Sequence, residues 1–259
     1  MTCLDNTTAL ITGASSGIGK ATAKQLAKAG VPRLILAARR TERLEQLVNE
    51  LQQSHDTNCL PLTLDVRDAS AVNQAINTLP SAFRAISLLI NNAGLALTSD
   101  PMHTADIQHW DTMIDTNIKG LLYTTRAIIP GMIERQSGHI INLGSIAGHE
   151  CYPGGNVYCA TKHAVKALTQ SLRLDLLGQP LRVTSIDPGM VATEFSTVRW
   201  GDAEKAHDFY AAHEPLTATD VANTIVFAAA QPAHVNIAEL VVMPTSQASA
   251  TAISKKQSS

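Results

Sequence analysis

The chain has 259 residues, of which 45% are hydrophobic and 16% charged, and its formal net charge is −2 at pH 7. This length and composition are typical of one large α/β domain with an extensive core. A chain so close to neutral lacks the basic character that attracts nucleic acid or an anionic membrane, so neither partner is predicted.

The scattered cysteines and histidines predict neither disulfides nor a metal site. No C-x-x-C pair occurs among the cysteines, which are therefore expected to be reduced thiols: Cys3, Cys59, Cys151 and Cys159. None of the nine histidines forms an H-E-x-x-H motif, and His139, His149 and His163 are expected to be packing or surface residues. With neither a signal-like start nor a run of about 18 apolar residues, a soluble cytoplasmic protein is expected.

Short apolar runs alternate with amphipathic segments along nearly the whole chain. The predicted strands are Thr8–Thr12, Arg33–Ala38, Asn58–Leu64, Ile86–Ile90, His139–Leu143, Leu181–Ile186 and Glu239–Met243. The predicted helices are Ile18–Ala29, Thr41–Gln53 (with Thr41 as its N-cap), Ala69–Leu79, a long region broken near Pro130, Val157–Leu177 and Ala218–Ala229. A polar stretch runs from Glu194 to Glu214, and the tail 254–259 is expected to fray.

This alternation predicts parallel βαβ units and hence an α/β fold: a doubly wound parallel sheet of about seven strands with helices on both faces. No linker or repeat divides residues 1–259, so a single domain is expected. In such a sheet, ligands bind outside the carboxyl ends of the strands.

A glycine-rich turn follows the first predicted strand. The sequence T-G-A-S-S-G-I-G, from Thr12 to Gly19, has the spacing G-x-x-x-G-x-G at a strand-to-helix junction. Such a turn lets the backbone approach a pyrophosphate, which lies against the N-terminus of the helix. The loop residues expected to contact a dinucleotide are Gly13, Ser15, Ser16, Gly17, Ile18 and Gly19.

The end of the second strand indicates which dinucleotide binds. A NAD site places an acidic residue about twenty residues beyond the last glycine. Here Ala38 stands at that position and is followed by Arg39 and Arg40. Because guanidinium groups match phosphate oxygens, NADP is predicted in preference to NAD.

The remaining motifs follow the later strands and fall on the same edge of the sheet. Asp65 and Val66 end the third strand, where adenine would lie, and N-N-A-G (91–94) ends the fourth. Ser145 follows the fifth strand and P-G-M-V-A-T (188–193) the sixth. This co-location predicts one shared site.

Tyr158 and Lys162 stand four residues apart in Y-C-A-T-K, on the helix after the fifth strand. Residues at this spacing are neighbours on one helical stripe, and a nearby cation lowers the pKa of a phenol. Beside Ser145, the pair is interpreted as a proton-transfer centre.

Together these motifs resemble the short-chain dehydrogenase/reductase family, along nearly the whole chain and in the family's order. The matching motifs are T-G-x-x-x-G-I-G, N-N-A-G, Asn117 in T-N-I-K-G, Ser145, Y-x-x-x-K and P-G-x-x-x-T. The resemblance implies a Rossmann-like core, a nicotinamide cofactor and a homotetramer. It also implies a cofactor-binding half at roughly 1–145 and a catalytic and substrate-binding half at roughly 145–250.

The resemblance assigns roles to individual residues. Tyr158 would be the general acid/base, Lys162 would hold the nicotinamide ribose and lower the pKa of Tyr158, and Ser145 would bind the substrate oxygen. Asn117 would anchor a water that links Lys162 to solvent. Further cofactor contacts are implied for Asn92, Pro188, Gly189, Val191 and Thr193.

Several stretches resemble one subgroup, the NADP-dependent 3-hydroxy acid dehydrogenases that act on serine and L-allo-threonine. They include A-R-R-T-E-R-L (38–44), N-N-A-G-L-A-L (91–97) and T-E-F-S-T-V-R-W (193–200). This implies oxidation of a 3-hydroxy acid such as serine, allo-threonine or 3-hydroxyisobutyrate, or reduction of the matching semialdehyde. A reductase of a 3-oxoacyl thioester, a ketosteroid or a xenobiotic ketone is an alternative, as is a non-catalytic NADP-sensing protein.

A substrate carboxylate requires a cation near the site. Arg199, in the segment after Thr193, is the candidate; the alternative is a solvated loop arginine.

Overall fold

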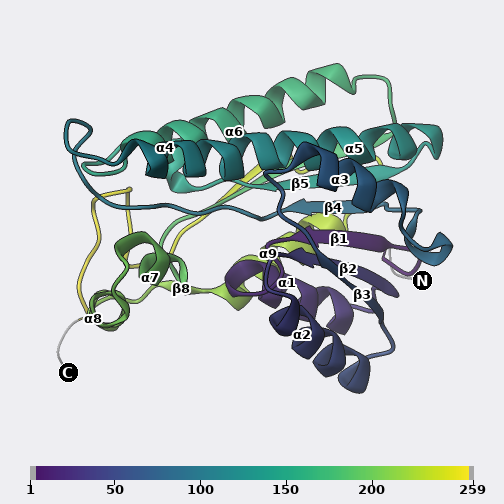
Figure 1. The fold of residues 1–259 in the computed structure, drawn as a ribbon, viewed down its shortest axis with the longest axis horizontal. Coiled ribbons are helices and arrows are strands. Elements are labelled where there is room, and N and C mark those ends of the chain that lie inside the picture. The colour runs from purple at the N-terminus through teal and green to yellow at the C-terminus, as the bar shows by residue number, and fades with distance from the viewer. Residues whose placement is uncertain (1–3, 257–259) are drawn as a thin grey trace.

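A parallel sheet of seven strands forms the centre of the molecule in the computed structural model, which describes residues 4–256 (Figure 1). The strand order is β3-β2-β1-β4-β5-β6-β9. The strands are β1 Thr8–Thr12, β2 Arg33–Ala38, β3 Asn58–Thr63, β4 Leu88–Asn91, β5 Gly138–Leu143, β6 Leu181–Pro188 and β9 Glu239–Val242. The prediction of a doubly wound sheet is confirmed.

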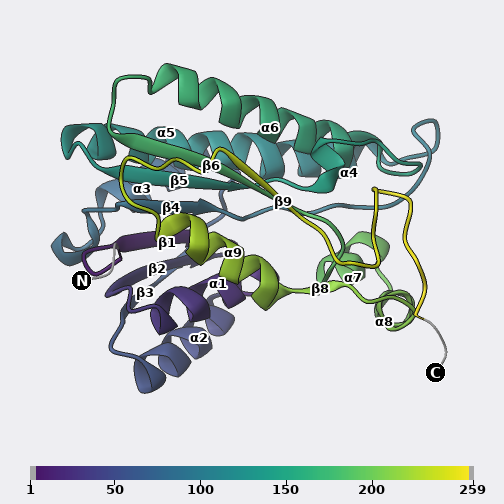
Figure 2. The same cartoon turned by 180° about the vertical axis from the view of Figure 1, so that it is seen from behind.

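Helices cover both faces of this sheet (Figures 1 and 2). One face carries α1 Gly17–Lys28, α2 Thr41–Ser54 and α9 Ala218–Ala229. The other carries α3 Ala69–Asn77, α4 Ile107–Ile114, α5 Leu121–Glu134 and α6 Asn156–Asp175. A smaller group lies beyond the carboxyl ends of the strands: β7 Val191–Ala192, α7 Phe195–Trp200, α8 Ala203–Ala211 and β8 Leu216–Thr217.

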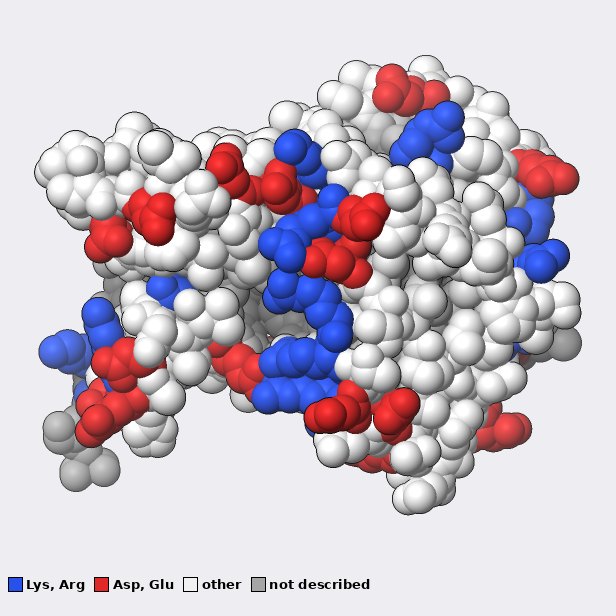
Figure 3. All heavy atoms as spheres, viewed as in Figure 1, with Lys and Arg blue, Asp and Glu red and all other residues white. Residues whose placement is uncertain are grey.

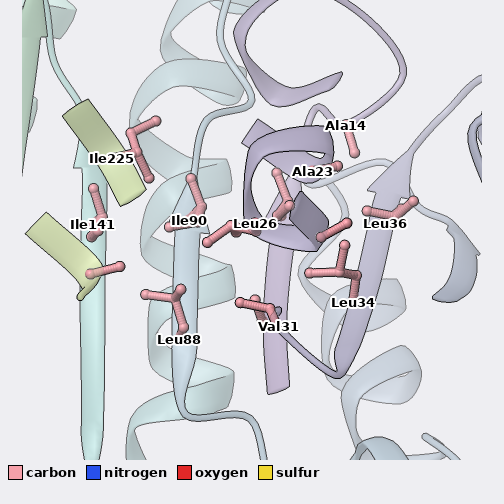
Figure 4. Close-up of a cluster of buried hydrophobic side chains, with 14 of the residues drawn as sticks. Ala14, Ala23, Leu26, Val31, Leu34, Leu36, Leu88, Ile90, Ile141 and Ile225 are labelled. Carbon is pink, nitrogen blue, oxygen red and sulfur yellow. The ribbon is translucent and has the colours of Figure 1, made fainter. Parts of the chain in front are cut away.

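The apolar runs form two core layers because successive strand residues point to opposite faces. Leu34 and Leu36 of β2 join the layer under α1 and α9, where Leu26 and Ile225 pack against them and their neighbours (Figure 4). The intervening Ile35 belongs to the opposite layer, with Leu10, Leu89, Ile140 and, from α5, Ile128 and Met132. Burial on both sides explains why these strands are continuous apolar runs rather than alternating ones.

The long helical region is interrupted at a different place from the one predicted. Pro130 lies inside α5, on its exposed side, where water can satisfy the carbonyl group left without a donor. The interruption is instead a π-helical segment, Asp115–Gly120, between α4 and α5. Single π-helical turns occur often at functional sites, and this one carries Asn117.

The helix caps show one further difference. Arg40, not Thr41, is the N-cap of α2, and its side chain makes no capping hydrogen bond. The Thr41 hydroxyl lies 2.8 Å from that of Thr63.

The polar stretch between Glu194 and Glu214 contains two helices, α7 and α8, that the sequence analysis did not predict. The Asp202 side chain accepts a hydrogen bond from the Lys205 amide at the start of α8, and Trp200 packs edge-on against Phe209 with centroids 5.3 Å apart. The helices have only six and nine residues, too few turns for apolar periodicity to identify them.

The described part of the C-terminal tail is hydrogen-bonded rather than frayed, contrary to the prediction. The Ser254 amide donates to the carbonyl of Ser246, and the Lys256 amide to that of Ala212. Residues 257–259 and Cys3 lie outside the described residues. Across residues 4–256, no helix has the length and apolar character needed to span a membrane.

Candidate active site

A cleft of about 350 Å³ lies at the carboxyl ends of the strands, a size in the range of small-molecule sites. Its walls include these predicted residues: Gly13, Ser15, Ser16, Ile18, Arg39, Arg40, Asp65, Val66, Asn92, Ser145, Tyr158, Lys162, Pro188, Gly189, Val191 and Thr193. The other four predicted residues, Gly17, Gly19, Asn117 and Arg199, are not on its walls.

Two glycines of the turn after β1 are required by close packing. Gly13 has φ +67°, and a Cβ there would lie 2.8 Å from Asn92 Nδ2. A Cβ on Gly19 would overlap the carbonyl oxygen of Gly13. The turn therefore stays close to the start of α1, where backbone N–H groups can receive a pyrophosphate.

Asn92 fixes this turn to the loop after β4. Its Nδ2 donates to the carbonyl of Thr12 at 2.9 Å, and its backbone amide donates to the Thr12 hydroxyl at 3.0 Å. Asn92 thus positions the cofactor loop as well as lining the cleft.

Arg40 extends from β2 to the glycine turn. Its Nε lies 3.1 Å from Ser15 Oγ and its Nη2 2.6 Å from Ser16 Oγ. Arg39 also lines the cleft, and the buried Ala38 supplies no carboxylate at this point. A glycine cradle with hydroxyl and guanidinium donors matches a dinucleotide with a 2′-phosphate.

Tyr158 reaches the cleft from the first turn of α6 and is only 8% exposed. Its ring packs against Phe195, with centroids 5.5 Å apart. Burial raises the pKa of Tyr158 and the neighbouring Tyr152 adds to this, whereas a hydrogen bond with Ser145 and the charge of Arg199 act in the opposite direction. The phenol is therefore protonated at neutral pH.

Lys162 lies one helical turn further along, as the spacing predicted. Its Nζ donates to the Leu143 carbonyl at 2.7 Å and lies 5.9 Å from the centroid of the Tyr158 ring. Burial lowers the pKa of Lys162 to about 8, although the charge of Asp187 acts in the opposite direction. Burial raises the pKa of Tyr158 overall, and the lowering by Lys162 that the resemblance implies stays a prediction.

Ser145 stands just beyond β5, where the chain turns into a short 3-10 helix. Its Oγ accepts from the Ala147 amide at 3.1 Å and lies 3.5 Å from the carbonyl of Pro188. The long second contact leaves the hydroxyl proton available to a ligand.

Asn117 lies behind the cleft, 2% exposed, in the π-helical segment. Its side chain exchanges two hydrogen bonds with the backbone of Leu95 and donates to Thr161 Oγ1 at 3.0 Å. Thr161 precedes Lys162, so Asn117 connects the β4 loop to the helix that carries Lys162.

Arg199 is held by the loop after β4 and the loop before α6, and it is not on the cleft wall. Its nitrogens donate to the carbonyls of Thr98 and Gly154 and to the hydroxyl of Tyr152, at 3.1–3.3 Å. Its guanidinium also lies over the Tyr152 ring, 5.3 Å from the centroid. Three of its five N–H groups are used in this way, which leaves two for another acceptor.

The cleft also contains residues that the sequence analysis missed. They are Ala37, Leu64, Leu95, Thr116, Leu143, Gly144, Glu194, Phe195 and Val198, whereas Ala38, Ala93 and Gly94 stand in stretches already assigned to the site. Phe195 and Val198 stand three residues apart, a helical spacing that could have indicated one apolar face over the site. No local pattern indicates Glu194. Its ion-pair partners are Arg43 in α2 and Arg40, which directly precedes α2.

One His/Asp/Glu group within residues 4–256 has the spacing of metal ligands: His149, Asp187 and Glu239. Lys166 Nζ lies 2.8 Å from His149 Nδ1 and 3.4 Å from a Glu239 oxygen. His149 Nε2 lies 2.9 Å from Asp187 Oδ2. The lysine supplies the positive charge that a metal ion would otherwise bring, so we interpret this group as an ion-pair network.

The fold and the cleft define a class of protein, the oxidoreductases that bind a nicotinamide dinucleotide on a doubly wound sheet. Residues 7–203 match the family described as short chain dehydrogenase. The protein belongs to the short-chain dehydrogenase/reductase family.

Similar proteins include two curated relatives and a solved structure. A NADP-dependent 3-hydroxy acid dehydrogenase of Schizosaccharomyces pombe is 45% identical over 99% of this chain and all of its own length. Sulfoacetaldehyde reductase 2 of Chromohalobacter salexigens is 50% identical over 92% of this chain and 94% of its own. The closed form of serine dehydrogenase complexed with NADP⁺ has a TM-score of 0.88 and 44% identity, covering 96% of this chain and 99% of its own.

Proposed function

We propose that the protein is an NADP(H)-dependent 3-hydroxy acid dehydrogenase, which oxidises a 3-hydroxyl group or reduces the matching carbonyl. The observation that carries this proposal is the convergence of Ser145, Tyr158 and Lys162 on the cleft that Arg39 and Arg40 border. Relatives described as NADP-dependent 3-hydroxy acid dehydrogenases, at 45–48% identity, support it.

The cofactor would lie mainly against the first half of the chain, roughly residues 1–145, while roughly residues 145–250 complete the nicotinamide end and bring the substrate to it. Ser15, Ser16, Arg39 and Arg40 would hold the adenosine end and its 2′-phosphate, with Asp65 and Val66 near the adenine. Asn92, Lys162 and the loop from Pro188 to Thr193 would hold the nicotinamide end. When bound, the nicotinamide supplies or accepts the hydride.

The protein's own residues carry the proton and hold the reacting oxygen. In the reduction, the Tyr158 hydroxyl donates its proton to the substrate oxygen, and in the oxidation the phenolate takes it back. Ser145 donates a hydrogen bond to that oxygen, where negative charge develops. Lys162 places a positive charge beside the phenol, and Asn117 fixes the turn of α6 that carries it.

The substrates named for the relatives have the same spacing between two functional groups, which narrows the class of substrate proposed for this protein. In serine and in the reduction product of sulfoacetaldehyde, one carbon separates the hydroxyl-bearing carbon from an anionic group, a carboxylate or a sulfonate. We propose that this chain accepts short alcohols with the same spacing. Sulfoacetaldehyde reduction is the second candidate activity, favoured by the 50% identity to that reductase.

Arg199 is proposed to bind the anionic group of the substrate through its two remaining N–H groups. We expect Arg199→Met to raise KM for 3-hydroxyisobutyrate about 10- to 100-fold and KM for a neutral secondary alcohol far less. Steady-state kinetics with both substrates measures the difference.

An Arg199→Lys variant separates charge from structure. It keeps the positive charge but loses the planar fork that contacts Tyr152 and Gly154, so we expect it to restore part of the acid KM. If Arg199→Met raises KM for the acid and for the neutral alcohol equally, Arg199 stabilises the loops and does not bind the acid.

The experiment that tests the function is a panel of substrates followed by NADPH absorbance. It compares NADP⁺ with NAD⁺ against serine, allo-threonine, 3-hydroxyisobutyrate, the hydroxysulfonate and simple secondary alcohols, and includes a 3-oxoacyl thioester and a ketosteroid for reduction. Activity confined to the non-acidic substrates would contradict the proposal, and so would equal use of the two cofactors.

The protein is further proposed to be a cytoplasmic homotetramer. The edge strand β9 exposes Val241 and α9 exposes Phe227, which remain 45% and 54% exposed in the single chain. An unpaired edge beside an apolar helix is suited to pairing with a second copy. Sedimentation velocity should give the mass of four chains, and a monomer at micromolar concentration would contradict this.

A further inference from the structure

Glu194 forms ion pairs across the mouth of the cleft. It directly follows Thr193 and is the N-cap of α7. Its Oε2 lies 3.1 Å from Arg40 Nη1, and both of its oxygens lie within 3.0 Å of Arg43 Nη1. Burial alone would raise the pKa of Glu194, but Arg40 and Arg43 lower it, so the carboxylate is charged at neutral pH.

One of these two arginines, Arg40, is a residue that a 2′-phosphate would need. Arg40 contacts Ser15 and Ser16 of the glycine turn with its other nitrogens, and Arg39 lines the cleft beside it. In Figure 3, Lys and Arg side chains gather with acidic ones along the margin of the hollow in the visible face. Carboxylates and phosphate esters accept from guanidinium groups in the same way, and two anions repel each other beside one arginine.

The carboxylate also fixes one end of a short helix over the cleft. Phe195 and Val198 of α7 line the cleft, and Phe195 packs against the ring of Tyr158. At the other end of α7, Arg199 is bonded to Thr98 and Gly154. A change at Glu194 therefore reaches a helix that touches the catalytic tyrosine.

We propose that Glu194 competes with the 2′-phosphate of NADP(H) for Arg40, so that binding of the phosphate releases the first turn of α7. The inference rests on the proposed function through the use of NADP(H). Glu194 is then a specificity-determining residue, because it weakens the binding of NADP(H) but not that of NAD(H). The competition also makes the position of α7 depend on whether the 2′-phosphate is bound.

Glu194→Gln tests the competition, with adenosine 2′,5′-bisphosphate and 5′-AMP as probes in calorimetric titrations. These fragments carry the adenosine end of NADP and of NAD without the nicotinamide. The variant should bind the bisphosphate about three- to tenfold more tightly than the wild type, as expected for removal of two exposed ion pairs. Its affinity for 5′-AMP should not change.

Glu50→Gln is the matched control. Glu50 pairs with Lys24 on the surface of α1 and α2, so the substitution removes the same charge outside the cleft. It should leave both titrations unchanged. The proposed competition is wrong if Glu194→Gln raises the affinity for both probes equally, or if it lowers the affinity for the bisphosphate.

Release of α7 is measured by the fluorescence of Trp200, whose Nε1 donates to Ser99 at 3.1 Å. The chain has only one other tryptophan, so a Trp110→Phe background isolates the signal. Saturating bisphosphate should change the Trp200 emission, and saturating 5′-AMP should not. An unchanged emission with the bisphosphate would overturn the coupling to α7.

The test of the Glu194 competition and the test of the proposed function can fail independently of each other. A wild-type protein that binds NADH as tightly as NADPH would contradict the cofactor preference. The competition is tested by the ratio between variant and wild type for each fragment, which does not depend on that preference.

Discussion

Replacement of Tyr158 by Phe is expected to reduce kcat about 10²- to 10⁴-fold while leaving the affinity for NADPH close to that of the wild type. The substitution removes the proton donor but keeps the ring that packs against Phe195. Steady-state turnover and NADPH fluorescence titration measure the two quantities on the same preparation.

Tyr123→Phe is the matched control for this prediction. Tyr123 lies on α5 and packs with Leu64, Val72 and Ala127, so its hydroxyl is removed outside the cleft wall. It should keep wild-type turnover. Unchanged turnover in Tyr158→Phe would refute the mechanism, and it would favour a protein that binds NADP without catalysis.

The direction of the Tyr158 pKa adds a pH dependence to the same prediction. Burial raises this pKa, so the proton-donating form predominates at neutral pH and the phenolate forms only as the pH rises. We expect kcat/KM for oxidation to increase with pH above neutrality, while reduction has no such rise. In Tyr158→Phe this difference between the two directions should disappear.

Much of the site could be predicted because most of its motifs directly follow a strand. Parallel strands bring their carboxyl ends to one edge, so Gly13, Arg40, Asn92 and Ser145 meet there whatever their separation in the chain. The strands could also be predicted from the sequence, because residues such as Leu34, Ile35 and Leu36 form unbroken apolar runs.

The remaining features depend on contacts that carry no local pattern. Glu194 pairs with arginines about 150 residues away, and nothing in its own neighbourhood indicates a charged partner. Gly120 ends the π-helical segment that carries Asn117, and a Cβ on it would lie 2.6 Å from Val66 Cγ2, a contact that no local pattern indicates.

The direction in which the pKa of Tyr158 shifts also could not be predicted from the local sequence. The spacing to Lys162 was correct, but spacing gives only the charge and not the burial. Desolvation of a phenol that is 8% exposed outweighs the nearby charges.

Replacement of Lys162 by Met is expected to lower kcat about 10²-fold or more and, at the same time, to stabilise the fold at neutral pH. In the proposed mechanism the amine acts as a buried charge, and burying that charge destabilises the fold. Its pKa falls from 10.5 to about 8 in the folded chain, a difference that corresponds to about 3 kcal/mol. Loss of the hydrogen bond to the Leu143 carbonyl offsets about 1 kcal/mol of the gain.

The pH dependence of this stabilisation identifies its cause. Below about pH 8 the amine is protonated in both the folded and the unfolded chain, so the wild type bears the whole cost of the buried charge. As the pH rises from about 8 to 10.5, the folded chain loses its proton first and the cost declines; above 10.5 both states are neutral and it is gone. Denaturant unfolding of the wild type and Lys162→Met at several pH values measures the difference, in which other titrating groups cancel. A gap in stability that stays constant across this range would mean that packing, and not the buried charge, distinguishes the two proteins.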